Sequence, residues 1–385
     1  ITRPIGECNM DLFKFTYATD PTILERGEAI NNALSIMWVE RYREPGEFEI
    51  SGKLSSGLRE FLPLGTLISH GDTYEVMIVE NHEIKDKTGT DPDISITGRS
   101  LDSYLENRIV GTNQTRTNNL YVPYTLTADY TWNQLVKIIN DHILNTSNTN
   151  DAFGNIVATT NVTGTSISTA REIKRDRLDR QVAQLLEIDD LGIKTIRRST
   201  FPGGNNIQTQ FLIYRGVNKS ASIIFSWQGG DLKTADYLWS DKTSKTSALV
   251  IGRYVNVMVD TAPTKFNRRT MLVDANDIDG NLSAPPAGAA LTDIVNKMTV
   301  RGNAAIMGQN RLTITRADIS DITQYEYRKD YNIGDLVTLN GNFGQIAVMR
   351  VMEYVEIEDE TGESGHPTLA VPDITGSGFR EVAGD

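Results

Sequence analysis

Residues 34–50 read LSIMWVERYREPGEFEI, and this stretch decides the fold class of the chain. Apolar side chains recur at every second position on both sides of a turn, at Leu34, Ile36, Trp38, Tyr42, Phe48 and Ile50. Alternation with a period of two is typical of a strand with one buried face. Glu44-Pro45-Gly46 supplies the turn, because proline fixes φ and glycine adopts conformations that other residues avoid. The stretch therefore predicts a β-hairpin.

A second hairpin follows, with strands at 67–68 and 74–78 around the turn His70-Gly71-Asp72. The elements expected after it are a strand at 94–96 behind the Asp91-Pro92 break and a short helix from Ser100, as N-cap, to near Arg108.

Residues 111–170 are rich in Thr, Asn and Ser, which predicts loops and weak strands. One helix interrupts them, because Trp132, Leu135, Val136, Ile139 and Ile143 share a helical face. Asp129 or Thr131 is expected to cap it. A charged helix is predicted over 173–190, with Gly192 as its stop.

The second half of the chain again favours strands. We expect them at 211–214, 223–225, 249–259, 269–273, 312–315, 336–339 and 346–357. A polar loop at 274–290 precedes an amphipathic helix that carries Leu291, Ile294, Val295 and Met298. The chain turns polar after Glu360.

Two segments resemble each other. One runs from Leu64-Gly65 into the strand 74–78, and the other runs from Ile333-Gly334 through Asn340-Gly341-Asn342 into the strand 345–349. Each is a strand begun by glycine, then a tight turn, then an alternating partner. Chance and duplication explain this equally well. A duplication predicts two related small β-barrels, and a ring of three such chains would have pseudo-sixfold symmetry.

The fold class expected is mainly β (β+α), with two small β-barrels and inserted α/β or loop-rich domains. The expected divisions are a first barrel at 1–110, an Asn/Thr-rich insertion with two helices at 111–192, a second barrel at 193–262 with 308–370, a loop and helix at 263–307, and a loose tail at 371–385. A length of 385 residues agrees with more than one domain.

Composition excludes several classes. The chain has 50 Asp and Glu against 38 Lys and Arg, a net charge of -12, which argues against a general nucleic-acid binder. Cys8 is the only cysteine, so neither an intramolecular disulfide nor a Cys-based zinc site is possible. No stretch approaches the roughly 18 apolar residues of a membrane span.

Residues with catalytic chemistry are sparse, and we expect no catalytic, cofactor-binding or metal-binding residues and no enzymatic activity. The four histidines, His70, His82, His142 and His366, lack the spacing of a helical metal site. No Gly-x-Ser-x-Gly elbow and no phosphate-binding Gly-x-x-x-x-Gly-Lys-Ser/Thr motif occurs.

Three charged stretches have structural interpretations. Residues 274–280 resemble a calcium loop, but the position that needs the first carboxylate is Ala275, so a solvated turn is favoured. The acidic residues at 356–363 fit the exposed end of a hairpin with its turn at Thr361-Gly362. The basic residues between Arg171 and Arg180 alternate with Asp176 and Asp179, which indicates a salt-bridged face turned outward or toward another subunit.

The order of several short motifs resembles the tail-hub proteins of siphophages. The motifs are residues 38–50, Thr97-Gly98-Arg99-Ser100-Leu101, 105–109, Ile213-Tyr214-Arg215-Gly216, 224–226, Val273-Asp274-Ala275 and Ile333-Gly334-Asp335-Leu336-Val337. That family is similar in architecture to the baseplate hub of contractile-tailed phages, a trimer whose chains each hold two tail-tube-like barrels.

The resemblance implies a structural virion protein at the distal end of the tail, assembled in the host cytoplasm. It implies a homotrimeric ring with a distal tail or tail-tube protein above it and a tip, spike or fibre protein below it. The tape-measure protein or DNA would pass through its lumen without specific binding, which agrees with an acidic chain because carboxylates repel DNA.

Two alternatives remain open. One is the distal tail adaptor ring, which the two barrel-like units and the length disfavour. The other is a glycan-binding or glycan-cleaving tail protein, since sugar sites pair aromatic platforms with carboxylates. The candidates for such a site are Trp227 and Trp239 near Asp231, Asp236 and Asp241.

Overall fold

The chain forms two compact units in the computed structural model, which describes residues 12–17, 23–71, 73–86, 91–111, 124–144, 156–160, 162, 167–168, 170–173, 176–199, 207–240, 244–260, 265–279, 284–307, 312–320, 324–341 and 346–370. The first unit comprises Ile1–Thr234 and Ala317–Pro372, and the second comprises Ala235–Arg316 and Asp373–Asp385. The predicted tail at 371–385 lies outside the described residues. The predicted domain boundaries stay a prediction.

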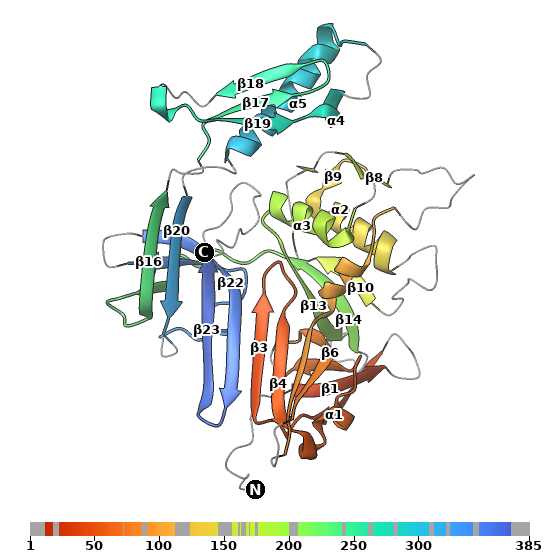
Figure 1. The fold of residues 1–385 in the computed structure, drawn as a ribbon, viewed down its shortest axis with the longest axis vertical. Coiled ribbons are helices and arrows are strands. Elements are labelled where there is room, and N and C mark those ends of the chain that lie inside the picture. Colours follow the sequence, from red (N-terminus) through yellow and green to blue (C-terminus); the bar gives the residue numbers. More distant parts are fainter. Residues whose placement is uncertain are drawn as a thin grey trace, which may run out of the picture. The chain divides into compact units, whose positions relative to one another are not determined.

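A 14-stranded mixed sheet dominates the first unit (Figure 1). Its strands follow the order β10-β14-β2-β1-β5-β6-β7-β4-β3-β22-β21-β15, with β13 beside β14 and β23 beside β22. The bounds are β1 Leu12–Tyr17, β2 Leu24–Ala29, β3 Ser35–Arg41, β4 Glu47–Lys53, β5 Leu67–His70, β6 Val76–Lys85, β7 Asp93–Ser100, β10 Ile156–Thr160, β13 Gly192–Ser199, β14 Ile207–Tyr214, β15 Ile224–Ser226, β21 Leu336–Asn340, β22 Ile346–Asp359 and β23 Gly362–Ala370.

The remaining elements of the first unit are short. Small two-stranded sheets join β8 (Tyr124–Leu126) to β12 (Arg171–Ile173) and β9 (Asp129–Tyr130) to β11 (Ile167–Ser168). The helices are η1 Leu54–Ser56, α1 Leu58–Phe61, the 3-10 helix η2 Leu101–Asn107, α2 Thr131–Ile139, its π-helical continuation η3 Asn140–Leu144, and α3 Leu178–Ile188.

The first predicted hairpin is confirmed as β3–β4. Trp38 lies opposite Phe48 and Ile36 opposite Ile50, so the alternating side chains share one buried face. They form a core with the buried faces of β5, β6 and β7, in which Ile94 and Ile96 are also enclosed. The expected mainly β fold class is therefore confirmed.

The similarity of the two glycine-started hairpins extends to their hydrogen bonds. Gly65 N–H donates to the carbonyl of Val79, and Gly334 N–H donates to that of Val351, both at 2.8 Å. The reverse bonds, from Val79 to Thr66 and from Val351 to Asp335, measure 2.9 and 3.0 Å. The hairpins β5–β6 and β21–β22 thus start with one register. Whether two superposable barrels surround them stays a prediction.

A second core lies between the helical insertion and the sheet. Leu135, Ile138 and Ile139 of α2 pack with Val182 and Leu185 of α3 over apolar residues of β13 and β14. α2 and α3 lie side by side (Figure 1). The predicted helical face of α2 is confirmed, but neither Asp129 nor Thr131 caps it, because Tyr130 is the N-cap residue and makes no side-chain cap bond.

Two sequence predictions are wrong in their bounds. The charged helix begins at Leu178 rather than 173, since residues 171–173 pair with β8 as a strand. The strand expected at 249–259 is two antiparallel strands, β17 (Ser247–Ile251) and β18 (Asn256–Asp260), with a turn that contains Gly252. The hairpin predicted with its turn at Thr361-Gly362 is present, and its second arm is the nine-residue strand β23, which pairs along β22.

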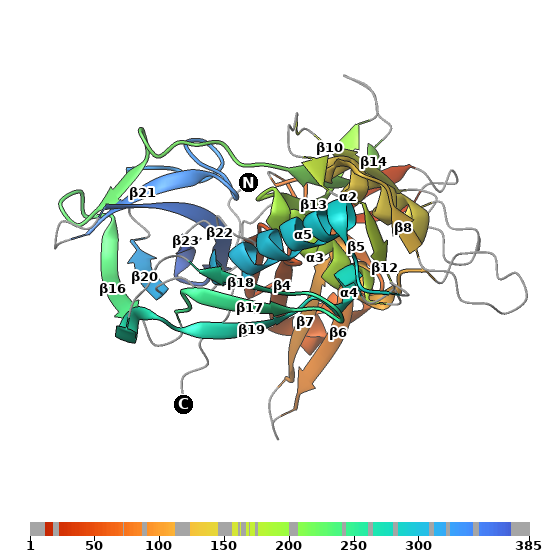
Figure 2. The same cartoon turned by 90° about the horizontal axis from the view of Figure 1, so that it is seen from above.

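The second unit contains a small α/β layer pair. Its sheet has the order β18-β17-β19, where β19 spans Thr270–Asp274. The 20-residue helix α5 (Gly288–Met307) covers one face of this sheet (Figures 1 and 2). The other bounds are η4 Lys265–Asn267 and α4 Asn276–Asp279, and the strands β16 (Leu232–Ser240) and β20 (Leu312–Ile319) pair where the chain enters and leaves this unit.

Candidate functional site

Two of the motifs that carry the family resemblance meet at the end of the β3–β4 hairpin. Gly46 N–H donates to Ser100 Oγ at 2.8 Å, and Ser100 N–H donates back to the Gly46 carbonyl at 2.9 Å. Gly98 lies under Phe48, where a Cβ atom would stand 1.8 Å from the Ile78 carbonyl oxygen and 2.8 Å from the Phe48 ring. The glycines are therefore required by close backbone approach.

Tyr42 connects this hairpin to the later motifs. A Cβ atom added to Gly192 or to Gly334 would lie 2.3 or 2.5 Å from the Tyr42 ring. Gly216 lies against the backbone of Gly334, at a distance that leaves no room for a side chain. Tyr214 completes the enclosure by an edge contact with Tyr42, with ring centroids 5.3 Å apart. Residues far apart in sequence thus form one glycine-lined socket for Tyr42.

Asp190 anchors this socket electrostatically. Its carboxylate pairs with the guanidinium groups of Arg43, at 2.5 Å, and of buried Arg350. The Tyr42 hydroxyl donates to the Asp190 carbonyl at 2.8 Å. Burial raises the pKa of Tyr42 to about 12, although the positive charge of Arg350 opposes the shift. The phenol is therefore a permanent hydrogen-bond donor at physiological pH.

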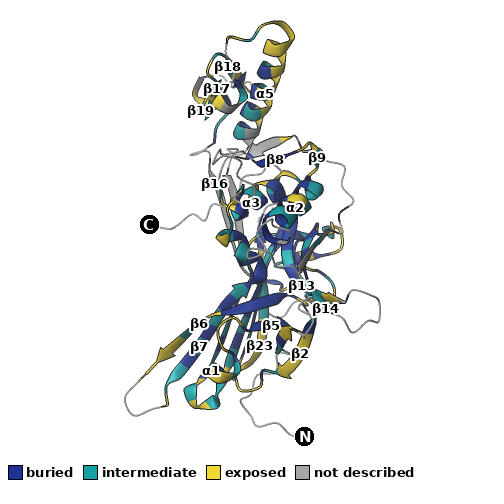
Figure 3. Ribbon diagram, turned by 90° about the vertical axis from the view of Figure 1, so that its right-hand side faces the viewer, coloured by how far each residue is buried: buried dark blue, intermediate teal, exposed yellow. Residues whose placement is uncertain are grey.

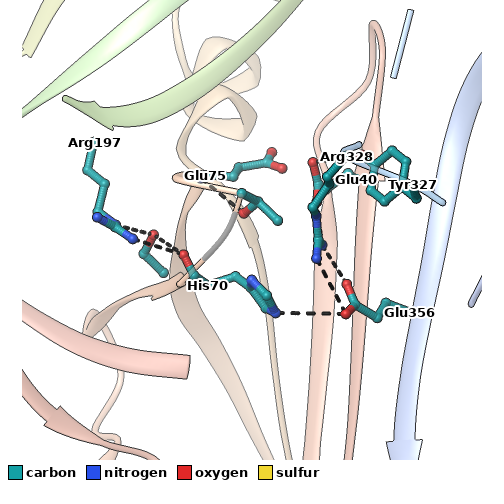
Figure 4. Close-up of polar contacts among 9 residues, drawn as sticks. Glu40, His70, Glu75, Arg197, Tyr327, Arg328 and Glu356 are labelled. Carbon is teal, nitrogen blue, oxygen red and sulfur yellow. Dashed lines mark hydrogen bonds and ion pairs between the residues drawn. The ribbon is translucent and has the colours of Figure 1, made fainter. Parts of the chain in front are cut away.

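A buried charge cluster joins β3 to β22 beside the socket (Figure 4). Glu40 and Glu356 are about 95% buried, and the guanidinium of Arg328 reaches both, at 3.1 and 2.5 Å. The Tyr327 hydroxyl donates to Glu40 at 3.1 Å. Burial raises the pKa of Glu356, and the Arg328 charge counteracts the shift. One cation thus pairs with two buried carboxylates.

Arg328 occupies a costly conformation to make these contacts. Its φ is +69°, in the left-handed region that non-glycine residues rarely adopt. Its own N–H donates to the Tyr331 carbonyl at 2.8 Å, which closes the tight turn. The turn is therefore built to project a guanidinium into the interior of the first unit.

His70 lies on the far side of Glu356. Its Nε2 atom is 3.9 Å from the Glu356 carboxylate, too far for a hydrogen bond. Burial lowers the pKa of His70 to about 3, and the positive charges of Arg328 and Arg197 add to this effect. Arg197 itself holds the β5 end by donating to Ser69 Oγ at 2.9 Å and to the carbonyl of His70 at 3.1 Å. His70 is therefore neutral at physiological pH.

Glu75 and Asp102 extend the cluster. Burial raises the pKa of Glu75 well above its usual range, and the neighbouring Glu40 and Asp102 raise it further. Burial also raises the pKa of Asp102 to about 6, and its hydrogen bond from Ser100 limits the shift. The whole arrangement joins β3, β5, β13, β22 and the 324–331 turn, so its chemistry is suited to holding strands in register.

A family model of the siphovirus ReqiPepy6 Gp37-like proteins matches residues 17–369. The chain belongs to this family. The resemblance to a siphophage protein family, predicted from the motifs, is confirmed. No curated protein matches the chain in sequence.

Solved tail proteins share the fold of this Gp37-like chain. The tail protein from Neisseria meningitidis MC58 is 11% identical, with a TM-score of 0.58 over 91% of this chain and 95% of that protein. The 43 kDa tail protein of prophage MuSo2 from Shewanella oneidensis is 13% identical, with a TM-score of 0.57 over 95% and 98%. Prophage tail protein gp18 from Listeria monocytogenes EGD-e is 11% identical, with a TM-score of 0.53 over 93% and 94%.

The four histidines of this Gp37-like chain lie on separate elements. His82 Nε2 is 2.7 Å from the Leu62 carbonyl, and His142 accepts from Gly111 N–H at 2.9 Å. His366 lies on β23 opposite Val355. In the part of the chain that the structure describes, no three His, Cys, Asp or Glu side chains are grouped as a metal would need. None of the described helices is long and apolar enough to span a membrane.

Asp279, the last carboxylate of the calcium-like loop, has a structural role. Asp279 accepts backbone N–H bonds from Arg253, Tyr254 and Val255 at 2.7, 2.7 and 3.0 Å. These bonds hold the pKa of Asp279 below its usual range although the side chain is buried. Asp274 caps Asn276, and the Asp277 side chain lies outside the described residues. The loop thus stabilises the β17–β18 turn.

Of the five residues proposed as a sugar site, the structure describes the side chains of Trp227 and Asp231. Asp231 is buried and accepts from Ser226 N–H at 3.2 Å, while the side chains of Asp236, Trp239 and Asp241 lie outside the described residues. A hollow of about 410 Å³ elsewhere is lined by tyrosines, but Tyr327 and Tyr354 stack on each other with centroids 3.8 Å apart. One face of each of these two rings is therefore covered by the other.

The basic stretch is salt-bridged as predicted where the structure describes its side chains. Arg177 pairs with Asp179 at 2.7 Å, and Arg180 with Asp176 at 3.8 Å. The acidic hairpin is confirmed as β22–β23, but Glu356 and Glu358 are buried rather than exposed. The sequence did contain a sign of this buried charge cluster. Glu40 occupies an inward position in the alternation of β3. A charged residue at such a position indicates a buried partner.

Proposed function

We propose that the chain is a tail-hub protein that forms a ring of three copies at the distal end of the phage tail. The observation that carries the proposal is the match of one siphovirus protein family to nearly the whole chain, residues 17–369, whose fold is shared by solved phage tail proteins. The ring would join the tail tube or distal tail protein to a tip, spike or fibre protein, and DNA or the tape-measure protein would pass through it. The role is structural and requires no enzymatic activity.

Unpaired strand edges support assembly into a ring. Among the strands that the structure describes, β23 pairs with β22 alone. The hairpin β6–β7 runs beyond β5, and its Glu80, Glu83 and Lys85 are exposed, as the outer end in Figure 3 shows. Such edges continue a sheet into a neighbouring subunit when they are brought together. The net charge of -12 suits a lumen that DNA must leave without binding.

Native mass spectrometry and electron microscopy of the purified full chain test this proposal. We expect a three-copy ring around an electronegative channel of about 20 Å or more, wide enough for duplex DNA. A sixfold ring would instead identify a distal tail adaptor. A protein that stays monomeric at high concentration and cleaves cell-wall glycans would refute the structural role.

A further inference from the structure

The β17–β18–β19 sheet of the second unit has one covered face and one exposed apolar face. α5 packs against Ala248, Val250 and Val259. On the opposite face, Leu249 stands directly between Met258 and Leu272 in the pairing of the three strands. Met258 is 48% exposed and Leu272 is 69% exposed. The sheet therefore presents a continuous row of aliphatic side chains to solvent.

An aromatic and basic stretch lies next to this sheet, before β19 begins. Phe266 precedes β19 and is 95% exposed. The following Arg269 carbonyl accepts from Thr246 N–H at 3.0 Å, which fixes this stretch at the end of the sheet where β17 and β19 begin. Lys245 and Arg268 lie in the same two segments, and Arg268 pairs with Asp260 at 3.2 Å. Single exposed apolar residues are ordinary, but an apolar row with a charged border is typical of a docking surface.

The charge of this region is opposite to that of the rest of the chain. Residues 235–316 contain 10 Lys and Arg against 7 Asp and no Glu, whereas the rest of the chain contains 28 Lys and Arg against 43 Asp and Glu. A basic insertion in an acidic chain is attracted to an acidic surface. Two copies of the insertion placed face to face would instead bring basic borders together.

We propose that this face, defined by Leu249, Met258, Phe266 and Leu272, docks on the acidic first unit of a second copy of the chain. The contact joins different surfaces of two identical chains, and contacts of this kind form a ring when the rotation from copy to copy closes. The inference rests on the proposed ring and adds the surface through which its copies recognise one another.

The size of the face sets how strong the contact is. A stable interface buries about 800 Å² on each partner, which is more than a row of three aliphatic side chains and one phenylalanine supplies. The contact therefore strengthens a ring that strand pairing also holds. Once the ring has closed, neighbouring surfaces are held at a high effective concentration. A weak contact between them then adds to the stability of the ring.

Leu272→Asp tests the surface, and Val300→Asp is its matched control. Val300 lies on α5 in the same unit and is also 69% exposed, so both variants place a carboxylate in solvent without disturbing the core. We expect Leu272→Asp to raise the concentration for half-assembly about tenfold or more, and Val300→Asp to leave it unchanged. Equal assembly of the two variants would overturn the inference.

Crosslinking between labelled copies identifies what covers the face. Carbodiimide, which couples lysine amines to carboxylates, is applied to a mixture of unlabelled and nitrogen-15-labelled chains. We expect Lys245 to couple to carboxylates of 1–234 or 317–372 in a differently labelled copy, and this product to fall in Leu272→Asp. If a three-copy ring forms while Lys245 couples only within its own copy, this inference fails and the hub proposal stands. A chain that never assembles would refute both.

Discussion

Gly65 and Gly334 hold equivalent places at the starts of β5 and β21, but their surroundings differ. Both adopt left-handed backbone conformations, with φ of +84° and +90°. A Cβ atom on Gly65 would meet no heavy atom within 4 Å, whereas one on Gly334 would lie 2.5 Å from the Tyr42 ring. Gly65 is therefore required by its backbone conformation alone. Gly334 is required both by its backbone conformation and by the lack of room for a side chain beside Tyr42.

The same difference extends along both hairpins. Beyond Val79, strand β6 runs into the exposed β6–β7 projection. Strand β22 instead lies beside β3 and carries Glu356 into the buried charge cluster. Asp335, next to Gly334, accepts from Val217 N–H at 2.7 Å and pairs with Lys219 at 3.1 Å. One backbone pattern thus serves as a projection in the first hairpin and as an anchor in the second.

Removing Arg328 should have the largest effect, because it tests whether the second hairpin is the anchored one. Arg328→Met leaves Glu40 and Glu356 buried without their cation, which typically costs about 3–5 kcal/mol. We expect a loss of this size in the urea unfolding of the first unit. The control is Lys329→Ala in the same turn, whose ion pair with Glu326 is exposed and should contribute little. Similar losses in the two variants would contradict the buried cluster.

Gly334→Ala should have the next largest effect. The added methyl group meets the Tyr42 ring, and the left-handed backbone disfavours alanine. Overpacking costs about 1–3 kcal/mol and the backbone about 1–2, so we expect a loss of about 3 kcal/mol in unfolding free energy. In the double variant Gly334→Ala with Tyr42→Leu, the smaller side chain should recover part of this loss. A loss below about 1 kcal/mol would show that the socket is loose.

Alternation made the β3–β4 hairpin predictable, since Trp38 and Phe48 both face one core. It could not reveal β13, whose sequence GIKTIRRS lacks that pattern and which is held in place by β14. Nor could it connect Arg328 with Glu40, which lies 288 residues away in sequence. The positions of these residues are determined by pairing between distant segments, and a local sequence pattern does not contain that information.

His70, at the end of β5 in the first hairpin, allows a test of the charge cluster. The test compares the stability of wild type and His70→Asn at two pH values. Unfolded chains protonate histidine near pH 6.5, while the pKa of folded His70 is about 3. The unfolded state then binds more protons between these values, so this residue destabilises the fold as pH falls. Wild type should lose about 2 kcal/mol more than His70→Asn between pH 7 and pH 5.

The difference between the two proteins isolates His70, because the raised pKa values of Glu75, Asp102 and Glu356 act in the opposite direction in both. Urea unfolding at the two pH values measures it. Parallel losses would mean that folded His70 takes up a proton, paired with Glu356 and in spite of Arg328 and Arg197.

Gly65→Ala should have the smallest effect, and it decides whether the two hairpins differ as the glycines suggest. The methyl group meets no neighbour, so only the left-handed backbone opposes it, at about 1 kcal/mol. We expect the unfolding free energy to fall by that amount, about a third of the loss for Gly334→Ala. Hydrogen exchange of Val79 N–H, which is bonded to the Thr66 carbonyl, should report the change locally. If the two alanine variants lose equal stability, packing against Tyr42 contributes nothing, and the anchor role of the second hairpin would have to rest on its charges alone.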